Sequence, residues 1–266
     1  MVEMPNSLTR ATEAPGTGIR GESQYPEDVG QREVEVFVDG TNIETHFRTN
    51  GIAGVDLGVL VELAVKEFGR CMARVLNGAT MLPCGSSPRW HCRKVWWFAS
   101  IPGNYHPGDK GLVQGTIKRL ARIAGRHGFE VQEVPWNHHG YHVRKADRAV
   151  SESVEERTWE KKEKGLDVSL ATRLLRRCLA PDRPDAVLVL TGDADQAYVL
   201  QDIIRNNPEI AVGVAAFRLQ LASIFWPGNV LGFQWHTHPV LLDRFLPKAT
   251  RARQANGSAA VLVKVA

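Results

Sequence analysis

The chain has 266 residues, of which 43% are hydrophobic and 23% charged, a composition typical of a globular protein and unlike that of disordered or fibrous chains. Lysine and arginine outnumber aspartate and glutamate by 33 to 29, so the formal net charge of +4 permits a polyanionic partner without demanding one. Four cysteines are too few and too irregularly spaced for a disulfide scaffold, and the absence of a CxxC pair argues against a zinc site. No apolar run approaches the roughly 20 residues of a membrane span.

One domain is expected between two polar ends. Residues 1–31 are rich in Gly, Pro, Ser, Thr and Glu and predict a disordered leader, whereas residues 248–266 predict a C-terminal tail. The domain spans 32–247 and carries a charged flap at 137–164. The N-terminus lacks a basic-then-apolar signal pattern, which favours a cytoplasmic protein.

Apolar runs and helical periodicities alternate along this domain. Strands are expected at 34–38, 94–99, 129–134, 186–190 and 210–217, with a last short strand at 230–233. Helices are expected at 56–68, 112–126, 168–179 and 196–206, with a terminal helix near 239–245, while the Pro- and Gly-containing stretch 70–93 predicts a loop. The alternation predicts an α/β fold, a three-layer sandwich whose central, mostly parallel sheet has helices on both faces.

Acidic residues stand at three junctions of this pattern. Asp39 directly follows the first strand, Asp167 opens the third helix, and Asp193 and Asp195 follow the fourth strand after Thr-Gly. The carboxyl ends of parallel strands, and the helix N-termini beside them, are where α/β folds bind ligands. Carboxylates that converge there repel one another unless a cation lies between them, so the pattern predicts a divalent metal site.

Each of these acids also has a purely structural interpretation. Asp39 could be a turn residue with Asn42 as the cap of a helix, and Asp167 could be an ordinary helix cap. Asp193 and Asp195 could be a helix cap and a second, surface aspartate beside it. Their coincidence at several junctions favours Mg²⁺ or Mn²⁺, in the arrangement that supports in-line phosphodiester cleavage.

The segments VFVDGTN, EKGLDVSLATRLL and VLVLTGDADQAYVLQDI, in that order, resemble the motifs of the NYN domain family of PIN-like ribonucleases. The resemblance covers roughly 34–245 and implies a PIN-like fold, metal-dependent ribonuclease activity and Mg²⁺ or Mn²⁺ as cofactor. It implies metal-binding roles for Asp39, Asp167, Asp193 and Asp195. It also implies ancillary roles in orienting water or ligands for Asn42 and for Thr191, which stands where serine is usual. Gln196 departs from the aromatic residue that is common after the last aspartate.

A basic helix face is the expected contact for nucleic acid. The helix 112–126 has no acidic residue and carries Lys118, Arg119, Arg122 and Arg126. Lys118, Arg122 and Arg126 step by four and share one face, opposite an expected buried stripe of Val113, Ile117, Leu120 and Ala124. Such a face suits a phosphate backbone, although a solvated helix face is an equally good interpretation. Lys164 and Arg173, on either side of Asp167, extend the expected contact.

The expected function is that of an endoribonuclease with RNA as its partner and no membrane association. Single-stranded DNA as a further substrate and a homodimer are left open. Two other classes also stay open: a catalytically weak RNA-binding or regulatory module of the same fold and, less favoured, a phosphatase that uses the same carboxylates.

Overall fold

The structure is a computed structural model that describes residues 31–80, 89–102, 110–136 and 165–251. Its strands are β1 (Arg32–Asp39), β2 (Trp90–Pro102), β3 (Glu130–Trp136), β4 (Ala186–Leu190), β5 (Ala211–Ala216) and β6 (Val240–Leu241). Its helices are α1 (Gly40–Thr49), α2 (Leu57–Thr80), α3 (Lys110–His127), α4 (Leu166–Cys178) and α5 (Gln196–Asn206), with short 3₁₀ turns η2 (Ser223–Phe225) and η3 (Leu242–Phe245). The predicted α/β alternation is confirmed.

The six strands form one sheet in the order β3-β2-β1-β4-β5-β6, and every neighbouring pair is parallel. The chain starts at the centre, moves outward to β3, and then returns to the other side of β1 to add β4, β5 and β6. In such sheets, ligands bind beyond the carboxyl ends of the strands where the winding reverses. Here that point lies between β1 and β4. Val38 is opposite Leu190, so the next residues, Asp39 and Thr191, are neighbours at the carboxyl ends of the two strands.

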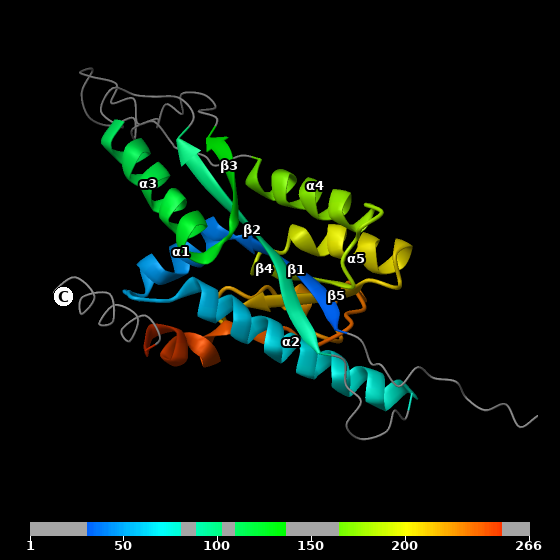
Figure 1. Ribbon diagram of the computed structural model, residues 1–266. Helices are drawn as coiled ribbons and strands as arrows, with labels where there is room; N and C mark the ends of the chain where they lie inside the picture. Colours follow the sequence, from blue (N-terminus) through cyan, green and yellow to red (C-terminus); the bar gives the residue numbers. More distant parts are fainter. Residues whose placement is uncertain (1–30, 81–88, 103–109, 137–164, 252–266) are drawn as a thin grey trace, which may run out of the picture.

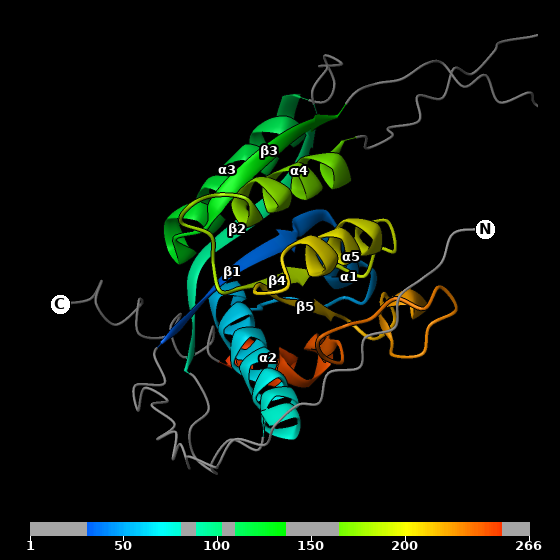
Figure 2. The same cartoon turned by 90° about the vertical axis from the view of Figure 1, so that its right-hand side faces the viewer.

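Helices cover both faces of the sheet (Figures 1 and 2), as a three-layer sandwich requires. Alternate side chains of β1 point to opposite faces, and both faces are covered, which is why the run Val36, Phe37 and Val38 is apolar without interruption. Val36 and Val38 belong to the core beneath α1, α2 and α3, whereas Phe37 belongs to the core beneath α4 and α5. Figure 2 shows α4 and α5 lying side by side across the second face.

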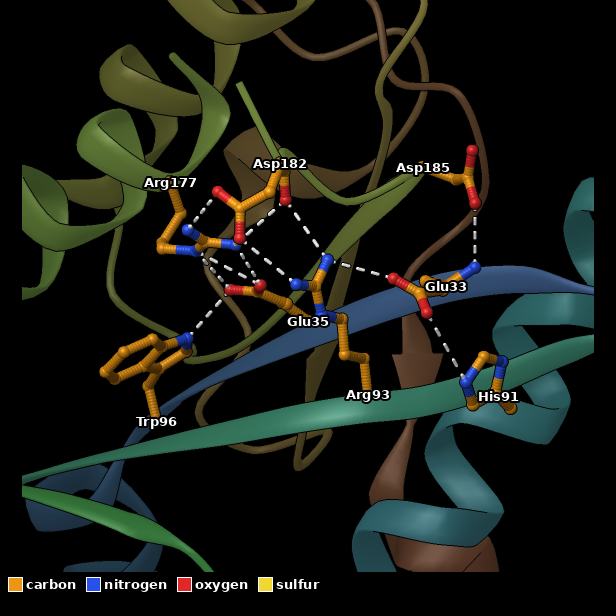
Figure 3. A network of polar contacts seen from close by, with 8 residues as sticks. All are labelled: Glu33, Glu35, His91, Arg93, Trp96, Arg177, Asp182 and Asp185. Carbon is orange, nitrogen blue, oxygen red and sulfur yellow. Dashed lines mark hydrogen bonds and ion pairs between the residues drawn. The ribbon is translucent and has the colours of Figure 1, made fainter. Parts of the chain in front are cut away.

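One charged residue, Glu35 of β1, lies inside the second core and is fully buried. Its carboxylate accepts the indole N–H of Trp96 at 2.9 Å, and two nitrogens of Arg177 donate to it at 2.6 and 3.0 Å (Figure 3). Arg177 also donates to Asp182, and the hydrogen bonds to both carboxylates raise the pKa of Arg177 above its ordinary value. Since Arg177 is in the last turn of α4, this ion pair fixes the helix that presents Asp167 at its other end.

One predicted segment, between the first predicted helix and the second predicted strand, is corrected by the structure. The loop predicted at 70–93 is wrong at both ends, because α2 continues to Thr80 and β2 begins at Trp90, while 81–88 lie outside the described residues. Phe68 and Met72, one helical turn apart, are both buried and carry the apolar face of α2 onward. The prolines that suggested a loop, at positions 83 and 88, lie beyond the end of this helix.

The predicted end of the domain is also corrected. The strand predicted at 230–233 is wrong, since Val230 is 97% exposed and the segment is irregular, and the last strand is instead β6. The helix predicted near 239–245 is replaced by β6 and η3, after which helical residues continue to 251. The apolar residues of the sequence alone could not show which of these segments is a strand. The strand is the segment that pairs with Ala215 and Ala216 of β5.

In α3 the buried stripe differs from the predicted one. Leu120 and Ile123 are buried, whereas Ile117 is 41% exposed, so the helix is rotated about its axis relative to the expectation. The predicted leader, the flap at 137–164 and most of the tail lie outside the described residues. No helix in the described ranges combines the length and apolarity needed to cross a bilayer.

Candidate metal centre

Three carboxylates come together at the carboxyl end of the sheet. Asp167, Asp193 and Asp195 each place one oxygen so that the three oxygens lie within 4.8 Å of one another. Asp167 is in the first turn of α4, while the other two lie in the loop between β4 and α5. Two oxygens on one Mg²⁺ lie at most about 4.2 Å apart, because each bond is about 2.1 Å long. A small side-chain adjustment therefore suffices for a shared cation.

A chain of hydrogen bonds holds the β4–α5 loop in shape. The backbone N–H of Asp193 donates to the hydroxyl of Thr191 at 3.1 Å, and the backbone N–H of Asp195 donates to the carboxylate of Asp193 at 3.0 Å. Thr191 is fully buried, and its own backbone N–H donates to the carbonyl of Ala215. The hydroxyl predicted to orient ligands is thus seen to shape the loop that carries two of the acids.

Gln196 connects the third acid to this loop. Its amide Nε2 donates to the carboxylate of Asp167 at 3.2 Å, and the side chain is buried. Burial and then the negative charge of Asp193 raise the pKa of Asp167 above its ordinary value; the Gln196 hydrogen bond opposes the rise, and Asp195 adds to it. Carboxylates whose pKa is shifted by burial and by a neighbouring charge are typical of functional sites.

Asp39 lies beside the group but is not one of the three close carboxylates. One of its oxygens accepts the backbone N–H of Asn42 at 2.9 Å, so Asp39 itself caps α1, whereas the structural interpretation from the sequence gave the cap to Asn42. The other accepts the hydroxyl of Thr191 at 3.4 Å. Asp39 therefore reaches the loop of Asp193 through Thr191, and its role as a metal ligand stays a prediction. The carbonyl of Asn42 accepts a hydrogen bond from Gln220.

Two glycines allow the backbone to pack closely at this edge. A Cβ at Gly192 would overlap the carbonyl oxygen of Gln220, and a Cβ at Gly40 would overlap the indole nitrogen of Trp97 and the carbonyl oxygen of Phe98. Gly40 and Gly192, which follow strands in two of the motifs, are thus at positions where neighbouring atoms leave no room for a side chain. Gln220, whose side-chain amide also donates to the carbonyl of Asn42, was not predicted from the sequence, since no periodicity or motif marks this loop residue.

Buried polar atoms of residues that contact the acids or their loops test whether the site fits a hydrated cation. The Oε1 atoms of Gln196 and Gln220 are both buried, and neither has a hydrogen-bond partner within the part of the chain that the structure describes. An unpaired buried acceptor costs about 1–3 kcal/mol, so such atoms are normally satisfied by ordered water. Mg²⁺ and Mn²⁺ keep several waters when protein carboxylates bind them, and the donor set here fits such an ion.

The basic residues predicted to contact nucleic acid have different surroundings. Arg119 forms an ion pair with Glu44 at 2.8 Å, and Arg126 forms one with Asp56 at 3.2 Å. Lys118 and Arg122 are exposed and form no ion pair with the described residues. Arg173 donates to Gln132 at 3.0 Å and lies 4.6 Å from the ring centre of Trp96. Lys164 lies outside the described residues.

Comparisons with known proteins do not assign a family. No family model matches the chain, and no curated protein matches it. A solved structure of a protein of unknown function from Vibrio parahaemolyticus aligns with 73% of this chain and 86% of its own, with 14% sequence identity and a TM-score of 0.39. A match at this level carries no argument about function. The NYN resemblance therefore stays a prediction based on the three motifs.

Proposed function

We propose that the protein is a metal-dependent ribonuclease that hydrolyses RNA phosphodiester bonds at the group formed by Asp167, Asp193 and Asp195. The observation that carries this proposal is the convergence of these acids, from two separate helix starts, at the point where the winding of the sheet reverses. The unpaired amide oxygens of Gln196 and Gln220 support it, because they offer acceptors to the water around a bound ion.

The three aspartates would hold Mg²⁺ or Mn²⁺. When bound, such an ion stabilises the charge on phosphate oxygens and favours the ionisation of water, which is the chemistry that phosphodiester hydrolysis needs. Gln196 keeps Asp167 oriented, and the Asp195 N–H keeps one oxygen of Asp193 in place. Thr191 links Asp193 to Asp39, which also caps α1 at the same edge.

Surface residues around the acids support a single-stranded polyanion as substrate. Val168 and Tyr198, each in the first turn of a helix that starts at the acids, are 68% and 64% exposed. An exposed aromatic ring can stack on an unpaired base. Lys118 and Arg122 have no competing ion pair among the described residues, so they are the best placed of the basic residues of α3 to contact phosphates.

The test is cleavage of a labelled single-stranded RNA by the purified chain, with Mn²⁺, with Mg²⁺ and in excess chelator. Asp193→Asn should lower the cleavage rate at least about 100-fold, because it removes one charge from the group that holds the ion. Asp202→Asn is the matched control, since Asp202 is an exposed acid further along α5 that bonds only Asn206 among the described residues. Undiminished cleavage by Asp193→Asn, or in chelator, would refute the proposal.

A second candidate, an RNA-binding module without catalysis, is favoured by the engagement of both Asp39 oxygens, which leaves three close carboxylates rather than four. It predicts RNA binding that survives chelation and no cleavage with either ion. A monophosphate ester in the same assay distinguishes a phosphatase, which would hydrolyse that ester faster than RNA.

A further inference from the structure

A hollow of about 510 Å³ lies on the flank of the sheet, between the later turns of α2 and the segment 226–245. Because α2 connects the carboxyl end of β1 to the amino end of β2, its later turns lie toward the amino ends of the strands. The acidic group lies at the carboxyl ends and shares no residue with this hollow. The volume of the hollow is in the range of small-molecule sites, roughly 300–1,000 Å³.

The charges around the hollow favour an anion. Arg74 and Arg244 line it from α2 and from η3, and neither forms an ion pair with the described residues. The only carboxylate in the described lining is that of Glu67, which is 2.9 Å from a guanidinium nitrogen of Arg70. Two guanidinium groups without carboxylate partners are well suited to a phosphate, which accepts their hydrogen bonds in a bidentate fashion.

Two neighbouring side chains in the lining add hydrogen-bond donors. The hydroxyl of Thr237 is buried and has no hydrogen-bond partner in the described part of the chain, and the whole residue is only 8% exposed. His236 accepts the backbone N–H of Val212 at its Nδ1, so its neutral ring carries the proton on Nε2. The Thr237 hydroxyl is an independent sign of a ligand, since a buried polar group without a partner is rare in native proteins.

A planar apolar wall completes the hollow. Trp226 is 37% exposed and stacks on no other aromatic ring among the described residues, and Val75 beside it on the lining is also exposed. Trp235, in contrast, packs against Phe225 and donates its indole N–H to a carbonyl, so it is a fixed part of the wall. An exposed indole next to unpaired arginines matches the combination of base and phosphate in a nucleotide.

We propose that this hollow binds a nucleotide, with its base against Trp226 and its phosphate between Arg74 and Arg244. The nucleotide is either free or part of a single RNA strand, because both present the same base and phosphate. This site is separate from the acidic group and does not depend on the proposed ribonuclease activity.

The test is calorimetric titration of the full-length chain, in chelator, with adenosine 5′-monophosphate, adenosine, inorganic phosphate and a five-residue oligoadenylate. Adenosine 5′-monophosphate or the oligoadenylate should bind more tightly than adenosine or phosphate alone. Trp226→Ala and Arg74→Gln should each weaken binding about tenfold, since each removes one of the two recognition elements. Arg205→Gln, at an exposed arginine in the last turn of α5, is the matched control and should bind as the unaltered chain does.

Thr237→Val separates a ligand role from a structural one. The substitution keeps the shape and removes the unpaired hydroxyl, so the melting temperature should stay the same or rise while nucleotide affinity falls. Equal affinity for the oligoadenylate and the monophosphate indicates a free nucleotide as the ligand, and binding of the oligoadenylate alone indicates an RNA strand. The proposal is overturned if neither binds at millimolar concentration or if Trp226→Ala and Arg74→Gln bind like the control. Asp193→Asn should leave this binding unchanged, which keeps the two proposals independent.

Discussion

Asp167 experiences two opposing influences at the start of α4. Burial and the neighbouring Asp193 raise the pKa of its carboxylate, while the amide of Gln196 stabilises the charged form. Since the folded chain holds a proton at Asp167 more readily than the unfolded chain does, folding stability is lost as the pH rises from about the ordinary value of 3.8 through the raised pKa. At neutral pH the ionised carboxylate therefore lowers the stability of the metal-free protein, and a bound cation would remove this penalty.

Asp167→Asn should accordingly make the metal-free chain more stable at pH 7 and no more stable below pH 3.8, where the carboxyl is already protonated. Added Mn²⁺ should stabilise the unaltered chain and not the variant. Urea denaturation in chelator across this pH range measures both effects. A variant that is less stable than the unaltered chain at pH 7 in chelator would show that the acid serves the fold and not a ligand.

At the scale of elements, α4 is positioned by the buried ion pair of Arg177 with Glu35 at its end (Figure 3). The same helix presents Asp167 at its beginning. Glu35 is fully buried, so loss of its partner leaves a carboxylate without a counter-charge in the core. Arg177→Ala should lower the free energy of unfolding by about 3–5 kcal/mol. It should also weaken Mn²⁺ binding, since α4 is no longer fixed against β1.

Arg176→Ala is the control for this substitution, because Arg176 is the exposed neighbour on the same helix. It should change stability by no more than about 0.5 kcal/mol. Equilibrium denaturation of both variants, followed by Mn²⁺ titration, provides the comparison. If the two variants lost the same free energy of unfolding, the ion pair of Arg177 with Glu35 would contribute nothing to stability.

The sequence predicts elements well where local pattern and tertiary environment agree. The strand at 186–190 and the helix at 196–206 have the predicted bounds, because an apolar run buried on both faces ends at Thr-Gly and an amphipathic run follows. The prediction failed for β6, whose two residues are defined by pairing with β5, and for the rotation of α3, which depends on how Leu120 and Ile123 meet the sheet. Such features arise from long-range contacts that no local window contains.

Parts of the candidate site were also predictable and parts were not. The convergence of Asp167 with Asp193 and Asp195 follows from strand order and motif position, since the carboxyl ends of parallel strands meet at one edge. The capping role of Asp39 and its bond with Thr191 needed coordinates, because the sequence does not say which groups its two carboxylate oxygens contact. The nucleotide hollow could not be foreseen, since its residues come from segments about 150 positions apart with no shared motif.

At the scale of the whole molecule, the two proposed sites lie in different parts of one rigid sheet. Residues that are far apart and share no partners contribute additively to stability. Mn²⁺ and a nucleotide should therefore each stabilise the chain by RT ln(1 + [L]/Kd), about 2.7 kcal/mol at 100 times Kd, and their effects should add to within about 0.5 kcal/mol.

Chemical denaturation with each ligand alone and with both together measures this additivity. The titrations should use Asp202→Asn as a reference that alters neither site. A combined effect that departs from the sum by more than about 1 kcal/mol would reveal coupling between the two sites, and would require a contact path through α2 or β5.

The central position of β1 in the sheet has a consequence for folding during synthesis on the ribosome. Asp39 and Thr191 are neighbours in space, yet 152 residues separate them along the chain. At usual rates of translation the nascent chain waits roughly 10–30 s for β4. Until α4 and α5 emerge, Phe37, Trp96 and Phe98 have no helices to cover them. Chaperones that bind exposed aromatic side chains would therefore bind the incomplete sheet on the face that α4 and α5 cover in the folded protein.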